Sequence, residues 1–153
     1  MSFYEDTLLP CVIDLACSSE PMMAFRKHVV PLAAGEVLEV GMGSGPNLAL
    51  YNPDTVKFVW GLEPSVGMHK RARKNLAKSP VTVKWLALRG EEIPLADNSV
   101  DCIVLTYTLC TIPDYAKALE QMYRVLKPGG KLLFCEHGLA PDAAVQKWQH
   151  RLS

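Results

Sequence analysis

The stretch Val37-Leu38-Glu39-Val40-Gly41-Met42-Gly43-Ser44-Gly45 decides the fold of this chain. Its first four residues are mostly apolar and predict a short buried strand. Glycine then occupies every second position of the loop that follows. Because glycine has no side chain, the backbone of such a loop can approach a ligand more closely than it could with any other residue at these positions.

An acidic residue follows the next predicted strand. That strand covers Phe58–Leu62, and Glu63 at its end lies about 20 residues beyond the middle glycine of the loop. A carboxylate can accept two hydrogen bonds from a pair of neighbouring hydroxyls, such as those of a ribose. Glycine loop, helix, strand and acid in this order predict a site for an adenosine-type cofactor.

Composition and charge exclude several classes of protein. The chain has 153 residues, of which 49% are hydrophobic and 21% charged, as in an ordinary globular domain. Lys and Arg balance Asp and Glu at 16 each, so no basic surface predicts a nucleic-acid partner. No apolar run approaches the roughly 20 residues of a membrane span, and the N-terminus lacks a signal pattern. We therefore expect a cytoplasmic protein, with no metal site predicted.

Helices and strands alternate regularly after a helical N-terminal segment. We expect that segment to cover residues 1–34, with a helix from Ser19 to about Pro31 whose face Met22, Phe25 and Val29 enters the core. A cofactor-binding domain then covers 35–153. Its expected strands are 37–40, 58–62, 81–86, 100–106 and 131–136, and its expected helices are 46–51, 65–78, 114–126 and 142–152.

Such alternation predicts parallel strands joined by right-handed crossovers. In sheets of this kind, ligands bind beyond the carboxyl ends of the strands. The residues that follow each strand are therefore the candidate site residues.

The glycine loop distinguishes between cofactors. A dinucleotide fingerprint requires glycine at position 46, where this chain has Pro46. The pattern Glu39-x-Gly41-x-Gly43-x-Gly45 instead resembles motif I of class I S-adenosylmethionine-dependent methyltransferases. Four further segments resemble that family in the same order, so that the resemblance extends over about residues 35–137: Gly61–Ser65, Ile93–Asp101, Leu105–Leu109 and Arg124–Leu132. The type is methyltransferase domain 11, and Cys135–His137 with Trp148 and Gln149 resembles its thiol and lipid subgroup.

The resemblance implies a three-layer Rossmann-like α/β sandwich with a mainly parallel sheet in the order 3-2-1-4-5. The family's usual C-terminal antiparallel hairpin is missing from the five strands counted here, so we expect a C-terminally truncated domain. The segment Leu132–Cys135 would then form an exposed apolar edge strand. A homodimer through this edge is one expected way of covering it.

The resemblance also assigns roles to residues. Glu39 either reaches the cofactor's ammonium group and the loop amides or only braces the loop, and Met68 packs either on adenine or in the core. Arg89 occupies the position where an acid is expected to hold the adenine amino group, so backbone groups of the next two residues are expected to bind the base. The expected cofactor-binding residues are Tyr4, Glu39, Gly41, Met42, Gly43, Gly45, Glu63, Pro64, Met68, Gly90, Glu91, Thr106 and Tyr107.

The expected function is transfer of a methyl group from S-adenosylmethionine to a small-molecule acceptor, with S-adenosylhomocysteine as the product. If the acceptor loses a proton, His137 is the candidate general base, since histidine titrates near neutrality; a structural role for His137 is the alternative. Two other functions stay open. One is a domain that binds the cofactor without catalysis because of truncation, and the other is a nicotinamide-dependent oxidoreductase.

Overall fold

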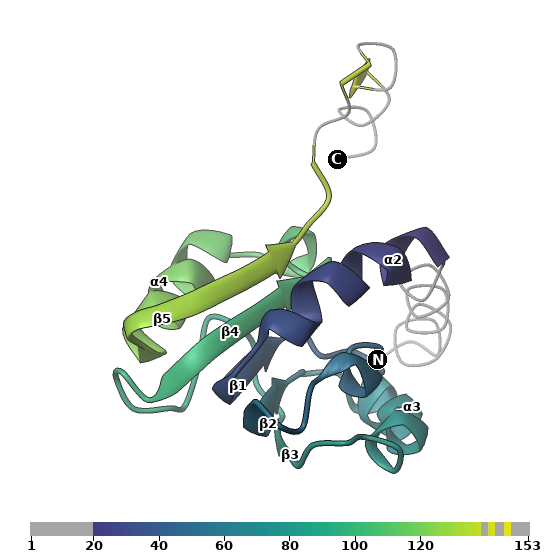
Figure 1. Ribbon diagram of the computed structural model, residues 1–153. Helices are drawn as coiled ribbons and strands as arrows, with labels where there is room; N and C mark the ends of the chain where they lie inside the picture. Colours follow the sequence, from purple (N-terminus) through teal and green to yellow (C-terminus); the bar gives the residue numbers. More distant parts are fainter. Residues whose placement is uncertain (1–19, 139–140, 143–145, 148–153) are drawn as a thin grey trace.

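A computed structural model describes residues 20–138, 141–142 and 146–147 of the chain. Its centre is a five-stranded parallel sheet in the order β3-β2-β1-β4-β5 (Figure 1). This confirms the predicted three-layer α/β architecture and the predicted strand order. The chain order reverses between β1 and β4, and such a switch point is where open α/β sheets bind ligands.

Helices and strands alternate along the described part of the chain. The α-helices are α2 (Glu20–Val29), α3 (Val66–Leu76) and α4 (Tyr115–Val125). Three short 3-10 turns are η2 (Val30–Leu32), η3 (Leu48–Leu50) and η4 (Leu109–Thr111). The strands are β1 (Gly35–Val40), β2 (Val56–Leu62), β3 (Val83–Leu86), β4 (Val100–Thr106) and β5 (Leu126–Cys135).

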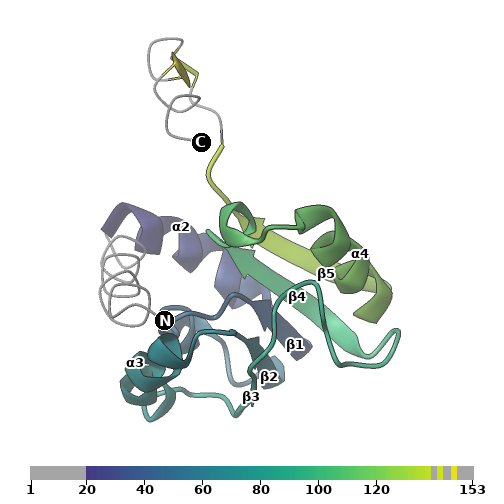
Figure 2. The same cartoon turned by 180° about the vertical axis from the view of Figure 1, so that it is seen from behind.

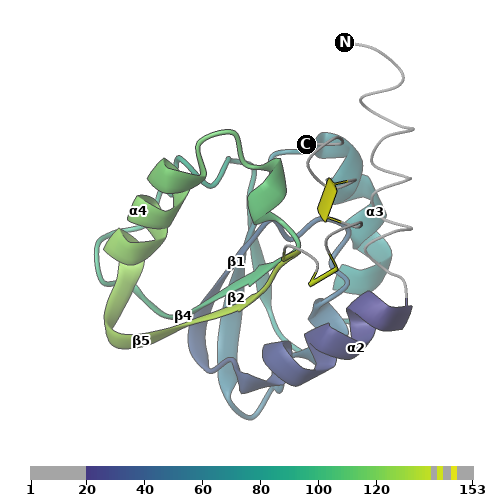
Figure 3. The same ribbon diagram turned by 90° about the horizontal axis from the view of Figure 1, so that it is seen from above.

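Helices cover both faces of the sheet, as the views from behind and from above show (Figures 2 and 3). On one face, α2 and α3 enclose a core to which β1 contributes Val37 and β4 contributes Val104. On the other face, α4 packs through Ala118, Met122 and Val125 on Leu38 and its neighbours. Because successive strand residues point to opposite faces, Glu39 of β1 lies on the same side as Val37, facing α2.

The helices predicted from residues 65 and 114 both begin with a side-chain cap. Ser65 precedes α3, and its Oγ accepts a hydrogen bond from the backbone N–H of Met68 at 3.3 Å. Asp114 precedes α4, and its Oδ1 accepts from the N–H of Lys117 at 3.0 Å. Both bonds pair a backbone donor that has no partner within the helix.

The helix predicted over 46–51 is wrong, since only the three-residue turn η3 forms there. Asn47 stands at the start of this turn, but its side chain does not cap it. The amide instead donates to Glu39 Oε1 at 2.9 Å and to Thr106 Oγ1 at 3.0 Å. These long-range bonds hold the segment in a tight turn against the sheet.

The face predicted for the first described helix is also partly wrong. Phe25 is 61% exposed, whereas Arg26 is 3% exposed and points into the molecule. Met22 and Val29 are half-buried. A polar cluster beneath the helix, described below, binds the guanidinium of Arg26 and thereby sets the orientation of α2.

The strand β5 begins directly after α4, earlier than the strand predicted over 131–136, so the segment Lys127–Gly130 lies within its bounds. The register with β4 moves from Val100 opposite Leu126 to Cys102 opposite Lys131, which leaves residues 127–130 as a bulge. Gly129 at φ +79° makes this bulge possible.

In the described part of the chain, β5 pairs with β4 alone, and Phe134 on it is 64% exposed. Pairing of a second copy along this edge stays a prediction that analytical sedimentation can test. Tyr4 and the possible helix within residues 1–19 lie outside the described residues, as does most of the predicted helix 142–152. No helix among the described residues is long and apolar enough to cross a membrane. The predicted division of the chain at residue 34 stays a prediction.

Candidate cofactor-binding site

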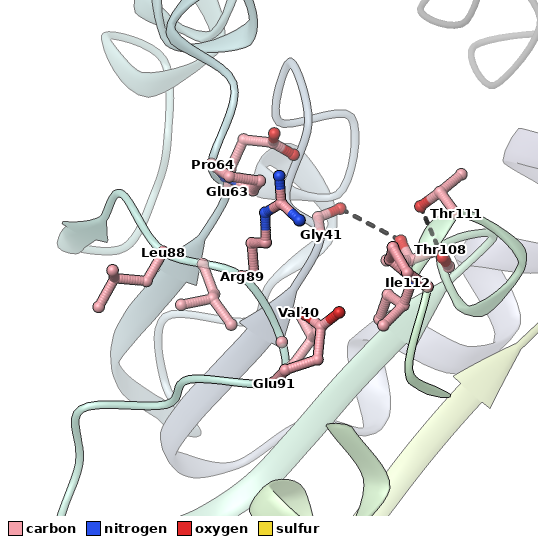
Figure 4. A pocket seen from close by; sticks show the side chains of 13 residues that line it. Val40, Gly41, Glu63, Pro64, Leu88, Arg89, Glu91, Thr108, Thr111 and Ile112 are labelled. Atoms are coloured by element: carbon pink, nitrogen blue, oxygen red, sulfur yellow. Dashed lines mark hydrogen bonds between the residues drawn. The ribbon is translucent and has the colours of Figure 1, made fainter. Parts of the chain in front are cut away.

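A cavity of about 270 Å³ opens at the carboxyl ends of β1, β2 and β4 (Figure 4). Val40, the last residue of β1, and Gly41, which follows it, form its floor. Glu63 and Pro64 after β2, with the segment 88–91 after β3, stand on one side, and the loop after β4 stands opposite them. The cavity therefore lies at the switch point of the sheet, where the sequence predicted the cofactor.

The glycine loop has the positive φ angles that its sequence predicts. Gly41, Gly43 and Gly45 have φ of +70°, +56° and +79°, a region that other residues rarely adopt. The N–H groups of Gly41 and Met42 both donate to the carbonyl of Leu62, at 2.8 and 3.1 Å, and so turn the loop at the end of β1. A side chain at Gly41 would collide with Thr108, so the floor of the cavity is backbone.

Glu63 holds the loop from the neighbouring strand end. Its Oε2 accepts from the N–H of Gly43 at 3.0 Å, and its Oε1 accepts from the N–H of Ser65 at 2.8 Å. Burial raises the pKa of Glu63, although these two N–H bonds and His69 act in the opposite direction. Each carboxylate oxygen accepts one of these N–H bonds and has two lone pairs, so each can still accept a hydrogen bond from a ligand hydroxyl in the cavity.

Glu39 is buried, binds the segment that follows the glycine loop, and does not line the cavity. It is 1% exposed, and its carboxylate accepts from Asn47 Nδ2 at 2.9 Å and from the Tyr51 hydroxyl at 2.7 Å. Burial raises the pKa of Glu39 to about 7, against the opposing effects of Tyr51, Asn47 and Arg26. Both roles predicted for Glu39, contact with the loop amides or the ammonium group and bracing of the loop, stay predictions.

Arg26 is the residue that sequence reasoning missed. Its Nη1 donates to Asn47 Oδ1 at 2.8 Å and to Thr106 Oγ1 at 2.5 Å, and its guanidinium lies 5.0 Å from the ring centre of Tyr107. Its Nε is buried and has no hydrogen-bond partner among the described residues. The signal that could have found it is Glu39, since an acid inside an apolar strand requires buried polar partners.

The loop after β3 forms the side of the cavity where the sequence predicts the adenine ring to bind. Gly90 is buried, and a Cβ there would lie 3.2 Å from Ile112 and in ordinary contact with Ala118 and Val40. The backbone at Gly90 therefore lies close against both β1 and the loop after β4. Arg89 and Glu91 flank this glycine and also line the cavity, and the guanidinium of Arg89 has no side-chain partner in the described part of the chain.

The structure separates the predicted site residues into two groups. Those lining the cavity are Gly41, Glu63, Pro64, Gly90 and Glu91. Five others lie outside the cavity lining: Gly43 and Gly45 shape the loop, Met42 and Met68 are buried in the core, and Thr106 is buried beneath Arg26. Their direct contact with a cofactor stays a prediction.

Tyr107 and His137 lie together at the ends of β4 and β5, outside the cavity lining. Their ring centres are 4.8 Å apart, and the Tyr107 hydroxyl accepts a bond from Cys135 Sγ at 3.2 Å. Tyr107 has φ +53°, a strained value for a residue other than glycine. His137 is exposed.

A family model described as a methyltransferase domain matches residues 38–134, which include the glycine loop, Glu63 and the loop after β4. The chain belongs to the class I S-adenosylmethionine-dependent methyltransferase family. This membership confirms the resemblance found in the sequence, and it argues against the nicotinamide alternative.

Several relatives of this methyltransferase domain are known. Thiol S-methyltransferase TMT1B of Homo sapiens is 36% identical over 71% of the chain and 46% of its own length. The rat protein of the same name is 34% identical over 76% of the chain and 48% of its own length. Demethylmenaquinone methyltransferase of Clavibacter sepedonicus is 27% identical over 82% of the chain and 50% of its own length. The chain thus spans about half the length of these curated relatives.

Solved structures share the fold. The Bacillus halodurans protein BH2331 superposes with a TM-score of 0.71 at 23% identity, over 85% of the chain and 57% of that protein. The S-adenosylmethionine-dependent methyltransferase TM1293 of Thermotoga maritima has a TM-score of 0.61 at 28% identity, over 84% of the chain and 57% of that protein.

Proposed function

We propose that this domain binds S-adenosylmethionine in the cavity at the switch point and transfers its methyl group to a small-molecule acceptor, with a thiol as the first candidate. The observation that carries the proposal is the pairing of Glu63 with a glycine floor in one cavity. The thiol is supported by relatives named thiol S-methyltransferase that are 34% and 36% identical to the chain.

The residues present fit an adenosine cofactor. The cavity floor at Gly41 is bare backbone, because a Cβ there would occupy the place of the Thr108 side chain. Glu63 faces the cavity and retains acceptor capacity for the two ribose hydroxyls. The segment Leu88–Glu91 would hold the base against Ile112, with apolar surface on both sides and backbone groups at its edge.

S-adenosylmethionine, when bound, supplies a methyl group on a positively charged sulfur, so the transfer is a one-step in-line displacement. The domain's task is to fix the donor relative to the acceptor, and alignment alone can contribute several kcal/mol. For a thiol acceptor, a bond forms between its sulfur and the methyl carbon, and the thiol proton leaves to a base or to solvent. The electron pair of the broken bond stays on the cofactor's sulfur.

His137 is the proposed base for that proton. It lies just beyond the end of β5 with its ring centre 4.8 Å from that of Tyr107, and its exposed ring can exchange protons with solvent. His137→Gln should remove one ionisation from the pH–rate profile for thiol methylation while leaving affinity for S-adenosylhomocysteine unchanged. An unchanged pH–rate profile would assign His137 to packing on Tyr107 alone.

Calorimetric titration with S-adenosylhomocysteine tests the cofactor site. We expect the chain to bind this product, and Glu63→Ala to weaken binding more than tenfold, which corresponds to about 1.4 kcal/mol. Glu120→Ala is the matched control, because Glu120 is an exposed acid on α4 away from the cavity. Equal affinities of the wild-type chain and Glu63→Ala would contradict the ribose role.

A panel of acceptors tests the reaction. Methyl transfer to small thiols is expected to exceed transfer to phenols and quinols. Preference for a quinol would favour the chemistry named in the demethylmenaquinone relative instead. Binding of S-adenosylhomocysteine without transfer to any acceptor would leave the domain as a cofactor-binding module, which is the alternative that the sequence leaves open.

A further inference from the structure

Glu136 makes contacts that the cofactor proposal does not use. It is the first residue after β5, and its carboxylate accepts hydrogen bonds from two successive backbone N–H groups of the loop after β4. The N–H of Thr108 lies 2.9 Å from Oε1 and 3.1 Å from Oε2, and the N–H of Leu109 lies 3.2 Å from Oε1.

These two N–H groups stand at the start of the turn η4, where helical turns leave donors unpaired. Thr108 occupies the cap position of η4, but its own side chain does not cap the turn. Its hydroxyl instead donates to the carbonyls of Thr106, at 3.1 Å, and Gly41, at 3.4 Å. The cap is therefore supplied by Glu136, from 28 residues further along the chain.

The loop that Glu136 holds is one whole side of the cavity. Thr108, Thr111, Ile112 and Pro113 line it, and Figure 4 shows the first three of them opposite Glu63, Pro64 and Leu88. The position of this loop sets the width of the slot between the two sides.

The loop begins with a strained residue that is bonded to the end of β5. Tyr107 begins it with φ +53°, and a non-glycine residue in this region carries strain of about 1–2 kcal/mol. The N–H of Tyr107 donates to the carbonyl of Cys135 at 2.8 Å, so the strained residue and the turn after it are both fastened to the end of β5. Leu109 and Ile112 also pack against the core, and Glu136 adds hydrogen bonds to the N–H groups of Thr108 and Leu109 at the point where the turn begins.

We propose that Glu136 is a positioning residue of the cofactor site, which fixes the side of the cavity formed by 108–113 without touching the cofactor itself. This inference rests on the proposed function for its effect on binding. The anchoring of the loop can be measured without any ligand.

The test is a series of Glu136 variants. Glu136→Ala removes both acceptors, Glu136→Asp withdraws them by one methylene, and Glu136→Gln keeps a single oxygen acceptor. Affinity for S-adenosylhomocysteine should fall about tenfold for Ala and Asp and about threefold for Gln, with Glu120→Ala as the unaffected control. Amide hydrogen exchange at Thr108 and Leu109 should accelerate in the same order, whereas amides of β1 and α3 keep their wild-type rates.

The outcomes separate the two proposals. If the wild-type chain does not bind S-adenosylhomocysteine, the proposed function fails, and the exchange rates alone decide on the anchor. If it binds, and Glu136→Ala binds equally well while its Thr108 amide exchanges fast, the positioning role is overturned. If Glu136→Ala does not unfold cooperatively, Glu136→Gln becomes the deciding variant. An intermediate loss of affinity in Glu136→Gln supports the positioning role. Unchanged affinity and unchanged amide exchange in Glu136→Gln refute it.

Discussion

Replacing Glu39 with glutamine should change how the stability of this domain depends on pH. Glu39 is buried in the middle of the sheet, and burial raises its pKa from the ordinary value of 4.5 to about 7. A raised pKa means that the folded state disfavours the charged carboxylate. The stability that the protonated Glu39 carboxyl contributes to the folded state is therefore fully present below pH 4.5 and is lost as the pH rises through 7.

The size of the effect follows from the shift. Each pKa unit corresponds to 1.36 kcal/mol, so the shift from 4.5 to about 7 amounts to about 3 kcal/mol of unfolding free energy between low and high pH. Glutamine at position 39 has the same shape and never ionises. The unfolding free energy of Glu39→Gln should exceed that of the wild-type chain by about 3 kcal/mol at pH 8 and by only about 1 kcal/mol at pH 5.

Urea unfolding at pH 5 and pH 8 measures this difference directly. Comparing each variant with the wild-type chain at the same pH cancels the contributions of other groups, including Glu63, whose pKa is also raised. Glu36→Gln is the matched control, because Glu36 lies on the same strand and is only half-buried. Tyr51→Phe should steepen the fall in stability with pH, since the Tyr51 hydroxyl lowers the pKa of Glu39. Parallel pH dependences for the wild-type chain and Glu39→Gln would refute the reasoning.

Substitutions at three further positions test the site and its support. Gly41→Ala should weaken S-adenosylhomocysteine binding at least tenfold, because φ is +70° and the new methyl group would collide with Thr108. The new methyl group of Gly43→Ala meets no atom within 4 Å, so this variant should lose only the free energy of backbone strain, about 1 kcal/mol. Equal effects of the two variants in calorimetry would contradict the steric argument. Arg124→Ala should lower the unfolding free energy by about 2 kcal/mol in urea, because its guanidinium donates to two backbone carbonyls of the segment 93–97 at 2.8 Å, and Arg124→Lys should recover less than half of that loss.

The features that the sequence predicts well are those set by local patterns. The apolar runs of β1 and β4 indicate buried strands, the glycine spacing indicates the loop, and Ser65 and Asp114 indicate where two helices begin. Each of these depends on residues within a few positions of one another. Parallel order then follows from the alternation of helices and strands, since crossovers are right-handed.

The polar cluster under α2 could not be predicted in this way. Arg26 bonds to Asn47 and Thr106, which lie 21 and 80 residues away. Nothing in the local pattern of α2 shows that Arg26 is buried and Phe25 exposed, because the apolar spacing alone favours the reverse. The same cluster uses the side chain of Asn47, and so replaces the expected helix after the glycine loop by a short turn.

The two carboxylates Glu63 and Glu136 show how the cavity keeps its shape. Each follows a strand that lies beside one of the two central strands, and each accepts N–H bonds from the loop of that central neighbour. Glu63 after β2 holds Gly43 in the loop after β1, and Glu136 after β5 holds Thr108 in the loop after β4. The two loops that meet at the switch point are thus fixed from outside by separate anchors that share no partner. The loops also contact each other, since Thr108 Oγ1 donates to the Gly41 carbonyl at 3.4 Å, so the losses of cofactor affinity should be non-additive in the double variant, as expected for coupled sites.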